Sequence, residues 1–115
     1  MPARGWLLRI SDILDAIAAI EGFTEGMDFA TFARDRRTID AVLHNLMAIG
    51  EAANHVPDDV VAAHPEIPWP DMRDMRNVVV HEYFGVNKEI IWDTVRLNLP
   101  PLAEPLRRLF EGGAG

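Results

Sequence analysis

The stretch WLLRISDILDAIAAI, residues 6–20, decides the class of this fold. Its apolar side chains recur every three or four residues. They are Leu7, Ile10, Ile13, Leu14, Ile17 and Ile20. Because an α-helix advances about 100° per residue, this spacing places them on one stripe along a helix. The stretch therefore predicts an amphipathic helix from about Trp6 to Phe23, which Gly22 and Gly26 end.

The same spacing continues after this first helix and predicts a second long one from about Asp35 to His55. Its apolar stripe consists of Ile39, Val42, Leu43, Leu46, Met47 and Ile49. A helix of one to two turns is expected between Pro57 and Pro65, and the following IPWP, residues 67–70, is expected to be extended.

In the second half of the chain, Asp71 opens a helix that is expected to end near Phe84 and Gly85. The last helix begins after Asn87, its expected cap. Pro100 and Pro101 supply no backbone N–H, so this helix has to kink or restart there.

No segment alternates with the period of a strand over more than a few residues. The sequence therefore predicts an all-α fold, an up-and-down bundle of four main helices with one or two short extra helices and a Pro-kinked C-terminal helix. A single domain is expected over residues 1–111, with a disordered tail at 112–115. Trp69 and Trp92 are expected in its core.

The composition limits the classes of function. The chain has 115 residues, a net charge of −7, no cysteine, and no apolar run near the roughly 18 residues of a membrane span. The negative charge disfavours non-specific binding to nucleic acid, whose affinity comes from neutralised phosphates. Without cysteine there are no disulfides or thiolate ligands, which fits a reducing, cytoplasmic setting. The start of the chain does not have the pattern of a signal peptide.

Groups that can do chemistry gather in RNVVVHEYF, residues 76–84. On a helical wheel, Met72, Met75, Val78 and Val79 form the buried face. Arg73, Asn77 and His81 form a separate polar stripe, and Arg76 stands at its edge beside Tyr83. Histidine transfers protons near neutral pH, and arginine offers a planar charge that matches phosphate. Asn77 lies one turn from His81 and is placed to fix its tautomer.

Spacing alone leaves two interpretations of this helix open: a reactive site, or a solvated face with an ion pair to a neighbouring helix. The same holds for Glu51, which either lines a cleft or forms a surface pair at a helix end. Gly50 is costly inside a helix, so a close approach of another helix is its expected reason. His44 and His64 are expected to be structural or solvated. No His-Glu-x-x-His motif or tight acidic cluster suggests a metal site, and no cofactor is expected.

The chain resembles the HepT-type toxins of the HEPN superfamily. Arg76, His81 and Tyr83 match their Arg-x4-His-x-Tyr signature. The similarity extends to residues 7–32, to residues 41–57 with the Gly-Glu-Ala step at 50–52, to residues 67–95, and to residues 99–109.

This resemblance implies the toxin of a two-gene (type VII) toxin–antitoxin module. It implies metal-independent RNA cleavage by a homodimer, with Arg76 and His81 as the catalytic pair. By their positions beside this pair, Asn77, Glu51 and Arg73 are the supporting candidates. It also implies a minimal nucleotidyltransferase antitoxin that transfers AMP to Tyr83. A non-catalytic nucleotide-binding or scaffolding partner of such a nucleotidyltransferase is the alternative. Several basic residues are candidates for an RNA path or for a solvated surface: Arg34, Arg36, Arg37, Arg73 and Lys88.

Overall fold

The computed structural model describes residues 5–83 and 87–114, and the side chains of residues 5–80 and 87–112. Throughout these ranges the regular structure is helical. The elements are α1 (Gly5–Thr24), α2 (Phe29–Ala33), α3 (Arg36–Asn54), α4 (Asp58–Ala63), α5 (Trp69–Arg73), α6 (Met75–Tyr83), α7 (Lys88–Asp93), the π-helical turn η1 (Thr94–Asn98) and α8 (Pro100–Ala114).

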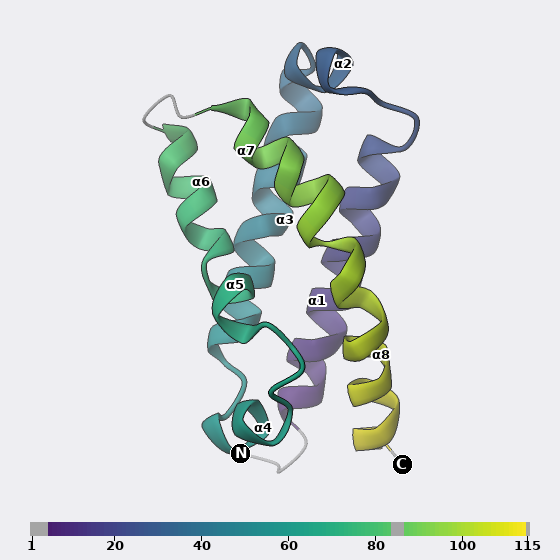
Figure 1. Ribbon diagram of the computed structural model, residues 1–115, viewed down its shortest axis with the longest axis vertical. Coiled ribbons are helices and arrows are strands. Elements are labelled where there is room, and N and C mark those ends of the chain that lie inside the picture. The colour runs from purple at the N-terminus through teal and green to yellow at the C-terminus, as the bar shows by residue number, and fades with distance from the viewer. Residues whose placement is uncertain (1–4, 84–86, 115) are drawn as a thin grey trace.

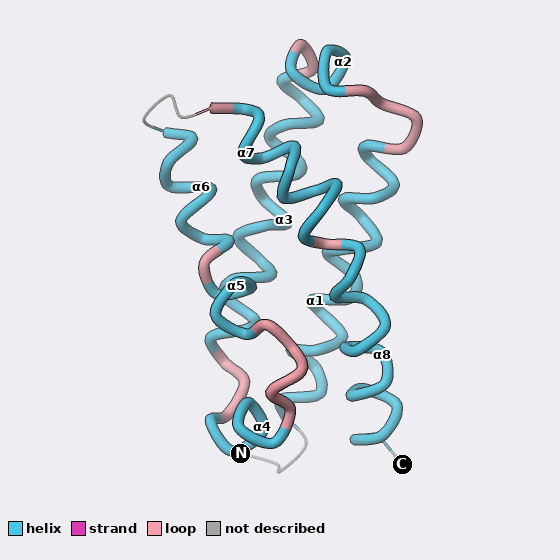
Figure 2. Tube along the Cα trace, viewed as in Figure 1, coloured by secondary structure: helices cyan, strands magenta, loops and turns pink. Residues whose placement is uncertain are grey.

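The long helices run alternately up and down, which confirms the predicted all-α bundle (Figure 1). α1 and α3 form the central antiparallel pair; α6 packs against α3, and α8 packs against α1. The fourth main element is a composite of α7, η1 and α8. The short helices α2 and α4 lie at opposite ends of the bundle, where loops reverse the chain (Figure 2).

The predicted apolar stripes fill the core. In α1, Ile10, Ile13, Ile17 and Ile20 are almost fully buried, and Leu14 is half-buried at the edge of the stripe. The stripe of α3 faces them. Trp69 is buried, as predicted. The Trp92 ring is partly buried against the core and stacks at a tilt on Phe32, with ring centroids 5.0 Å apart.

Polar side chains set the starts of several helices. The Asp28 carboxylate accepts a hydrogen bond from the backbone N–H of Thr31 at 2.8 Å, and that of Asp35 accepts one from Thr38 at 3.0 Å. Asn87 caps α7 as predicted, because its side-chain oxygen accepts from the backbone N–H of Glu89 at 2.9 Å. Each bond satisfies a donor that the first turn of a helix leaves without a partner.

The helix predicted to start at Asp71 is in fact two helices. α5 begins at Trp69, inside the segment expected to be extended, and the chain breaks at Asp74 before α6. Proline is tolerated in the first turn, since N–H groups there have no intrahelical partner. The indole N–H of Trp69 donates to the His64 carbonyl at 3.0 Å, which ties this turn to the preceding loop. The expected end at Phe84 and Gly85 lies outside the described residues.

The last helix restarts at its prolines, as predicted. Before them, the Leu99 N–H donates to the Thr94 carbonyl at 3.0 Å, the wide spacing of a π-turn. α8 then begins at Pro100, and the Leu102 N–H donates to the Leu99 carbonyl across the restart. α8 continues to Ala114, through most of the tail that was expected to be disordered.

Candidate active site on helix α6

The core face of α5 and α6 is the one that the helical wheel predicts. Met72, Met75 and Val79 are buried, and Val78 is half-buried. The third valine of the run, Val80, is 45% exposed. Met75 and Val79 therefore hold α6 against the core, and much of the remaining helix surface is left to its polar residues.

Arg76 leaves α6 toward α3 and meets Glu51. Its Nε lies 2.9 Å from Glu51 Oε1, and both side chains are 47% exposed. The ion pair with a neighbouring helix, one of the two interpretations left open by spacing, is thus present. An ion pair this exposed contributes at most about 1 kcal/mol to stability. The ion pair therefore adds little to the stability of the fold, but it fixes the direction of the Arg76 side chain.

Gly50 explains how the two helices come close enough for this pair. It is buried in α3, directly under the Arg76 side chain. A Cβ built on Gly50 would overlap Arg76 Cγ, and it would lie 3.2 Å from both Cδ and the backbone nitrogen of Arg76. The expected reason for a glycine inside this helix, close approach of another helix, is confirmed.

Arg73 and Asn77, the two supporting candidates on α5 and α6, bind groups other than Arg76 and Glu51. Arg73 Nε donates to the Ala53 carbonyl at 3.4 Å, near the C-terminal end of α3, where a positive charge is favourable. The Asn77 amide donates to Asp74 Oδ1 at 2.8 Å. Asn77 therefore closes the junction between α5 and α6, and one of its amide hydrogens is engaged there.

His81 and Tyr83 belong to the last turn of α6. Their side chains lie outside the described residues, so the catalytic role of His81, its link to Asn77 and the modification of Tyr83 stay predictions. By helical geometry, His81 is one turn beyond Asn77, and Tyr83 is two turns beyond Arg76.

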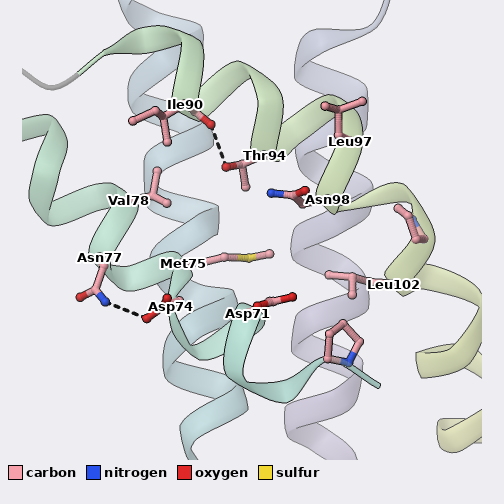
Figure 3. A pocket seen from close by; sticks show the side chains of 12 residues that line it. Asp71, Asp74, Met75, Asn77, Val78, Ile90, Thr94, Leu97, Asn98 and Leu102 are labelled. Carbon is pink, nitrogen blue, oxygen red and sulfur yellow. Dashed lines mark hydrogen bonds between the residues drawn. The ribbon is translucent and has the colours of Figure 1, made fainter. Parts of the chain in front are cut away.

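A groove that sequence reasoning missed lies on the flank of α6 away from Arg76. It has a volume of about 520 Å³ and is bounded by α5 and α6 on one side and by α7, η1 and α8 on the other (Figure 3). Met75, Val78 and Leu102 contribute apolar surface, and Asp71 and Asp74 contribute carboxylates. Ile90 and Leu97, also part of its lining, are 44% and 66% exposed. No local signal in the sequence joins these segments, which meet only through the packing of the bundle.

A second groove, of about 500 Å³, lies between α1 and α3. Glu51 lines it together with Arg9, Asp12, Asp15 and Asn45. Glu51 is thus both the partner of Arg76 and part of an open polar surface between α1 and α3, and its place in a reactive cleft stays a prediction.

Four other basic and histidine residues have partners on elements other than α6. Arg36 pairs with Asp40 at 2.9 Å, and Lys88 Nζ donates to the Ala33 carbonyl. His64 Nδ1 lies 3.5 Å from Glu66 Oε2, and His55 Nδ1 lies 2.7 Å from the Glu51 carbonyl. Within the described side chains, no three His, Cys, Asp or Glu residues are grouped in a way that could hold a metal ion. Of the described helices, none is long and apolar enough to cross a membrane.

Comparisons with known proteins agree with the motif on α6. Residues 13–109 match the family model described as "Ribonuclease HepT-like". The chain is 41% identical over 100 residues to "Probable ribonuclease HepT" of Thermococcus cleftensis, covering 87% of this chain and 91% of that protein. It is 39% identical over 100 residues to a protein of Methanocaldococcus jannaschii named as a candidate RNase, covering 87% and 83%. A second such protein of that organism is 31% identical over 111 residues, 96% of each chain.

No solved structure gives a significant match. The family model nevertheless covers most of the bundle, from the middle of α1 to the last turns of α8, and includes the whole of α6. This chain therefore belongs to the HepT-like ribonuclease family.

Proposed function

We propose that this protein is an endoribonuclease and the toxin of a type VII toxin–antitoxin module in the cytoplasm. Its family and the ribonuclease names of its relatives support an activity on RNA. The observation that carries the proposal is Arg76, a half-exposed guanidinium on the motif helix, held at Nε by a single carboxylate oxygen. Its terminal nitrogens are suited to bind the oxygens of a phosphate.

The reaction uses the nucleophile that RNA itself carries. A neutral His81 takes the proton of the 2′-hydroxyl, and the 2′-oxygen forms a bond to phosphorus. The bond from phosphorus to the 5′-oxygen breaks, and that oxygen receives a proton from an acid. The products are a 2′,3′-cyclic phosphate and a 5′-hydroxyl. Arg76 stabilises the negative charge that builds up on the phosphate oxygens. No metal is needed for these steps.

A homodimer supplies the second proton-transfer group. The motif contains one histidine per chain, while the reaction needs both a base and an acid. Two copies of α6 that face a common cleft would provide both, with the histidine of the second copy as the acid. Dimerisation is thus part of the proposed mechanism.

Neutralisation by a minimal nucleotidyltransferase completes the proposal. The enzyme transfers AMP to the hydroxyl of Tyr83. Tyr83 and Arg76 share one edge of α6, seven residues apart. The phosphate of the AMP group would therefore compete with RNA for the arginine, and its nucleoside would occupy the cleft.

One observation favours a different function. Arg76 is already paired with Glu51, on a chain with a net charge of −7. A surface of this kind suits a non-catalytic partner of a nucleotidyltransferase, in which the arginine only holds the phosphate of a nucleotide. Both functions require a phosphate site on α6. Only the ribonuclease would cleave RNA, so an assay of RNA cleavage distinguishes the two.

The deciding experiment is cleavage of RNA by the purified chain in the presence of EDTA. We expect products with cyclic or opened phosphate ends, and no products from His81→Ala at the same concentration. Induced expression without the partner should stop growth for the wild type and not for His81→Ala. Ends with a 3′-hydroxyl, or cleavage that returns only with added metal, would replace this mechanism by hydrolysis with water.

A further inference from the structure

Gly50 and Glu51 are neighbours on α3, and both contact the side chain of Arg76 on α6. We propose that these two residues position Arg76 for the reaction: Gly50 leaves room for the arginine stem, and Glu51 fixes the direction of its guanidinium. This inference rests on the proposed function, in which Arg76 binds the phosphate.

Glu51 contacts the guanidinium through Nε, on the side edge of the group. A guanidinium has a second edge, formed by its two terminal nitrogens, which can bind a phosphate in bidentate fashion. Within the described side chains, Arg76 forms no ion pair other than the one with Glu51. Glu51 therefore holds the arginine by the edge that the phosphate does not need and leaves the other edge for the substrate.

Gly50 fixes where the arginine stem runs. Any larger residue at position 50 would place its Cβ on Arg76 Cγ, near the backbone end of the side chain, and close to the Arg76 nitrogen. The contact involves the start of the side chain and the backbone, so rotation of the far end of the arginine does not relieve it. Either the stem turns away or α6 moves off α3, and in both cases the guanidinium changes place.

Two other roles for Glu51 make different predictions. As an ordinary surface pair, Glu51 would contribute little to stability and nothing to the reaction. As a competitor of the phosphate, it would weaken substrate binding, so that its removal would lower KM. As a positioning residue, it acts on the geometry of the transition state, so that its removal lowers kcat. A displacement of about 1 Å can reduce a rate on the order of 100-fold.

The first experiment measures kcat and KM of RNA cleavage for Glu51→Ala and Glu51→Gln. We expect kcat to fall by about 10- to 100-fold in Glu51→Ala. Glu51→Gln should recover part of this loss, because its amide oxygen still accepts from Nε. Glu104→Ala is the matched control, since Glu104 forms an exposed pair with Arg107 within α8. A Glu51→Ala enzyme with unchanged kcat, or with a lower KM and a higher rate, would overturn the proposal.

The second experiment changes the glycine. Gly50→Ala should lower kcat by a similar factor. The matched control is Gly22→Ala, also helical, where an added Cβ meets nothing within 4 Å. The control should keep the activity of the wild type and equal or exceed its Tm, because alanine favours a helix. A Gly50→Ala protein with full activity would show that the position of the arginine stem does not matter.

A thermal double-mutant cycle tests the contact without any need for activity. Gly50→Ala should lower Tm more in the wild type than in an Arg76→Ala background, where the overlapping Cγ is absent. Equal losses in both backgrounds would refute the steric part of the proposal. If the wild type cleaves no RNA while the cycle shows this coupling, the proposed function has failed and the arrangement of Gly50 and Arg76 still stands.

Discussion

At the scale of the residue, the candidate site depends on side chains that lie outside the core. Arg76 is half-exposed, and its partner Glu51 equally so. The apolar residues of the same helix turn, Met75 and Val79, are buried and hold α6 in place. The candidate site residues and the buried residues of this short helix are thus different ones, so substitutions at the exposed polar positions can test function without removing core contacts.

Arg76→Ala and His81→Ala should each abolish cleavage while the fold persists. An exposed ion pair contributes at most about 1 kcal/mol, so we expect Arg76→Ala to shift Tm by a few degrees only. Circular dichroism and thermal unfolding measure the fold, and cleavage of a labelled RNA measures the activity. Arg107→Ala, which breaks the exposed pair with Glu104, is the control and should remain active. A large loss of Tm in either variant would mean that the residue is structural.

Tyr83→Phe separates catalysis from neutralisation. Phenylalanine keeps the ring and removes only the hydroxyl that would accept AMP. We expect the variant to cleave RNA and to remain toxic when it is co-expressed with the nucleotidyltransferase, whereas the wild type is silenced.

Mass spectrometry of both proteins, purified with the partner, measures the modification directly. The wild type should carry the mass of AMP on Tyr83, and the variant should lack it. AMP on another residue of the wild type, or no AMP at all, contradicts the assignment. This measurement also decides the matter if the variant proves inactive.

At the scale of the element, carboxylates at helix starts make the fold sensitive to acid. The hydrogen bond from the Thr31 backbone keeps the pKa of Asp28 below its ordinary value of 3.8, and the one from Thr38 does the same for Asp35. A carboxylate whose pKa is lowered by folding stabilises the fold fully above its unfolded pKa. This contribution is lost as the pH falls through the lower, folded value.

Asp35→Asn should therefore flatten the acid side of the stability profile. Asparagine is also a good N-cap and does not titrate. We expect the Tm of the wild type to fall more steeply below about pH 4 than that of the variant, with smaller differences near pH 7. Asp35→Ala, which removes the cap altogether, should be less stable at both pH values. Parallel profiles for the wild type and Asp35→Asn would show that this cap does not contribute to acid sensitivity.

At the scale of the whole molecule, the single chain offers half of the proposed site. Only one motif histidine and one Arg76 are present per bundle, and α6 lies at the edge of the bundle, packed on α3 (Figure 1). The outer side of α6 and the nearby groove with the exposed Ile90 and Leu97 are open in the single chain. A second copy facing α6 would complete the pair of proton-transfer groups.

We therefore expect the purified protein to be a dimer or a higher even assembly. Light scattering at micromolar concentration should give at least twice the 12.9 kDa of the chain. Mixing the wild type with an excess of inactive His81→Ala should lower the activity of the wild-type chains, because a mixed dimer keeps only one of the two histidines that the site needs. A monomer mass for an active enzyme would rule out a site shared between copies.

The all-α class, the α1 and α3 core stripes, the Asn87 cap and the restart at the prolines were all predictable from the sequence. Each depends on local spacing or on the chemistry of a single residue, such as the missing N–H of proline. The motif residues of α6 were recognisable only through their resemblance to a known family, because helical spacing alone fits a solvated face with an ion pair equally well.

Tertiary structure alone decided the rest. The start of α5 at Trp69 goes with a buried indole and its bond to His64, a contact that periodicity does not contain. The pairing of Arg76 with Glu51 joins residues 25 positions apart in the chain, and it requires α6 to approach α3 at Gly50. The sequence determines which face of each helix is apolar. Which polar side chains of two neighbouring helices meet is decided only when their apolar faces pack, because it depends on how closely the two helices approach each other.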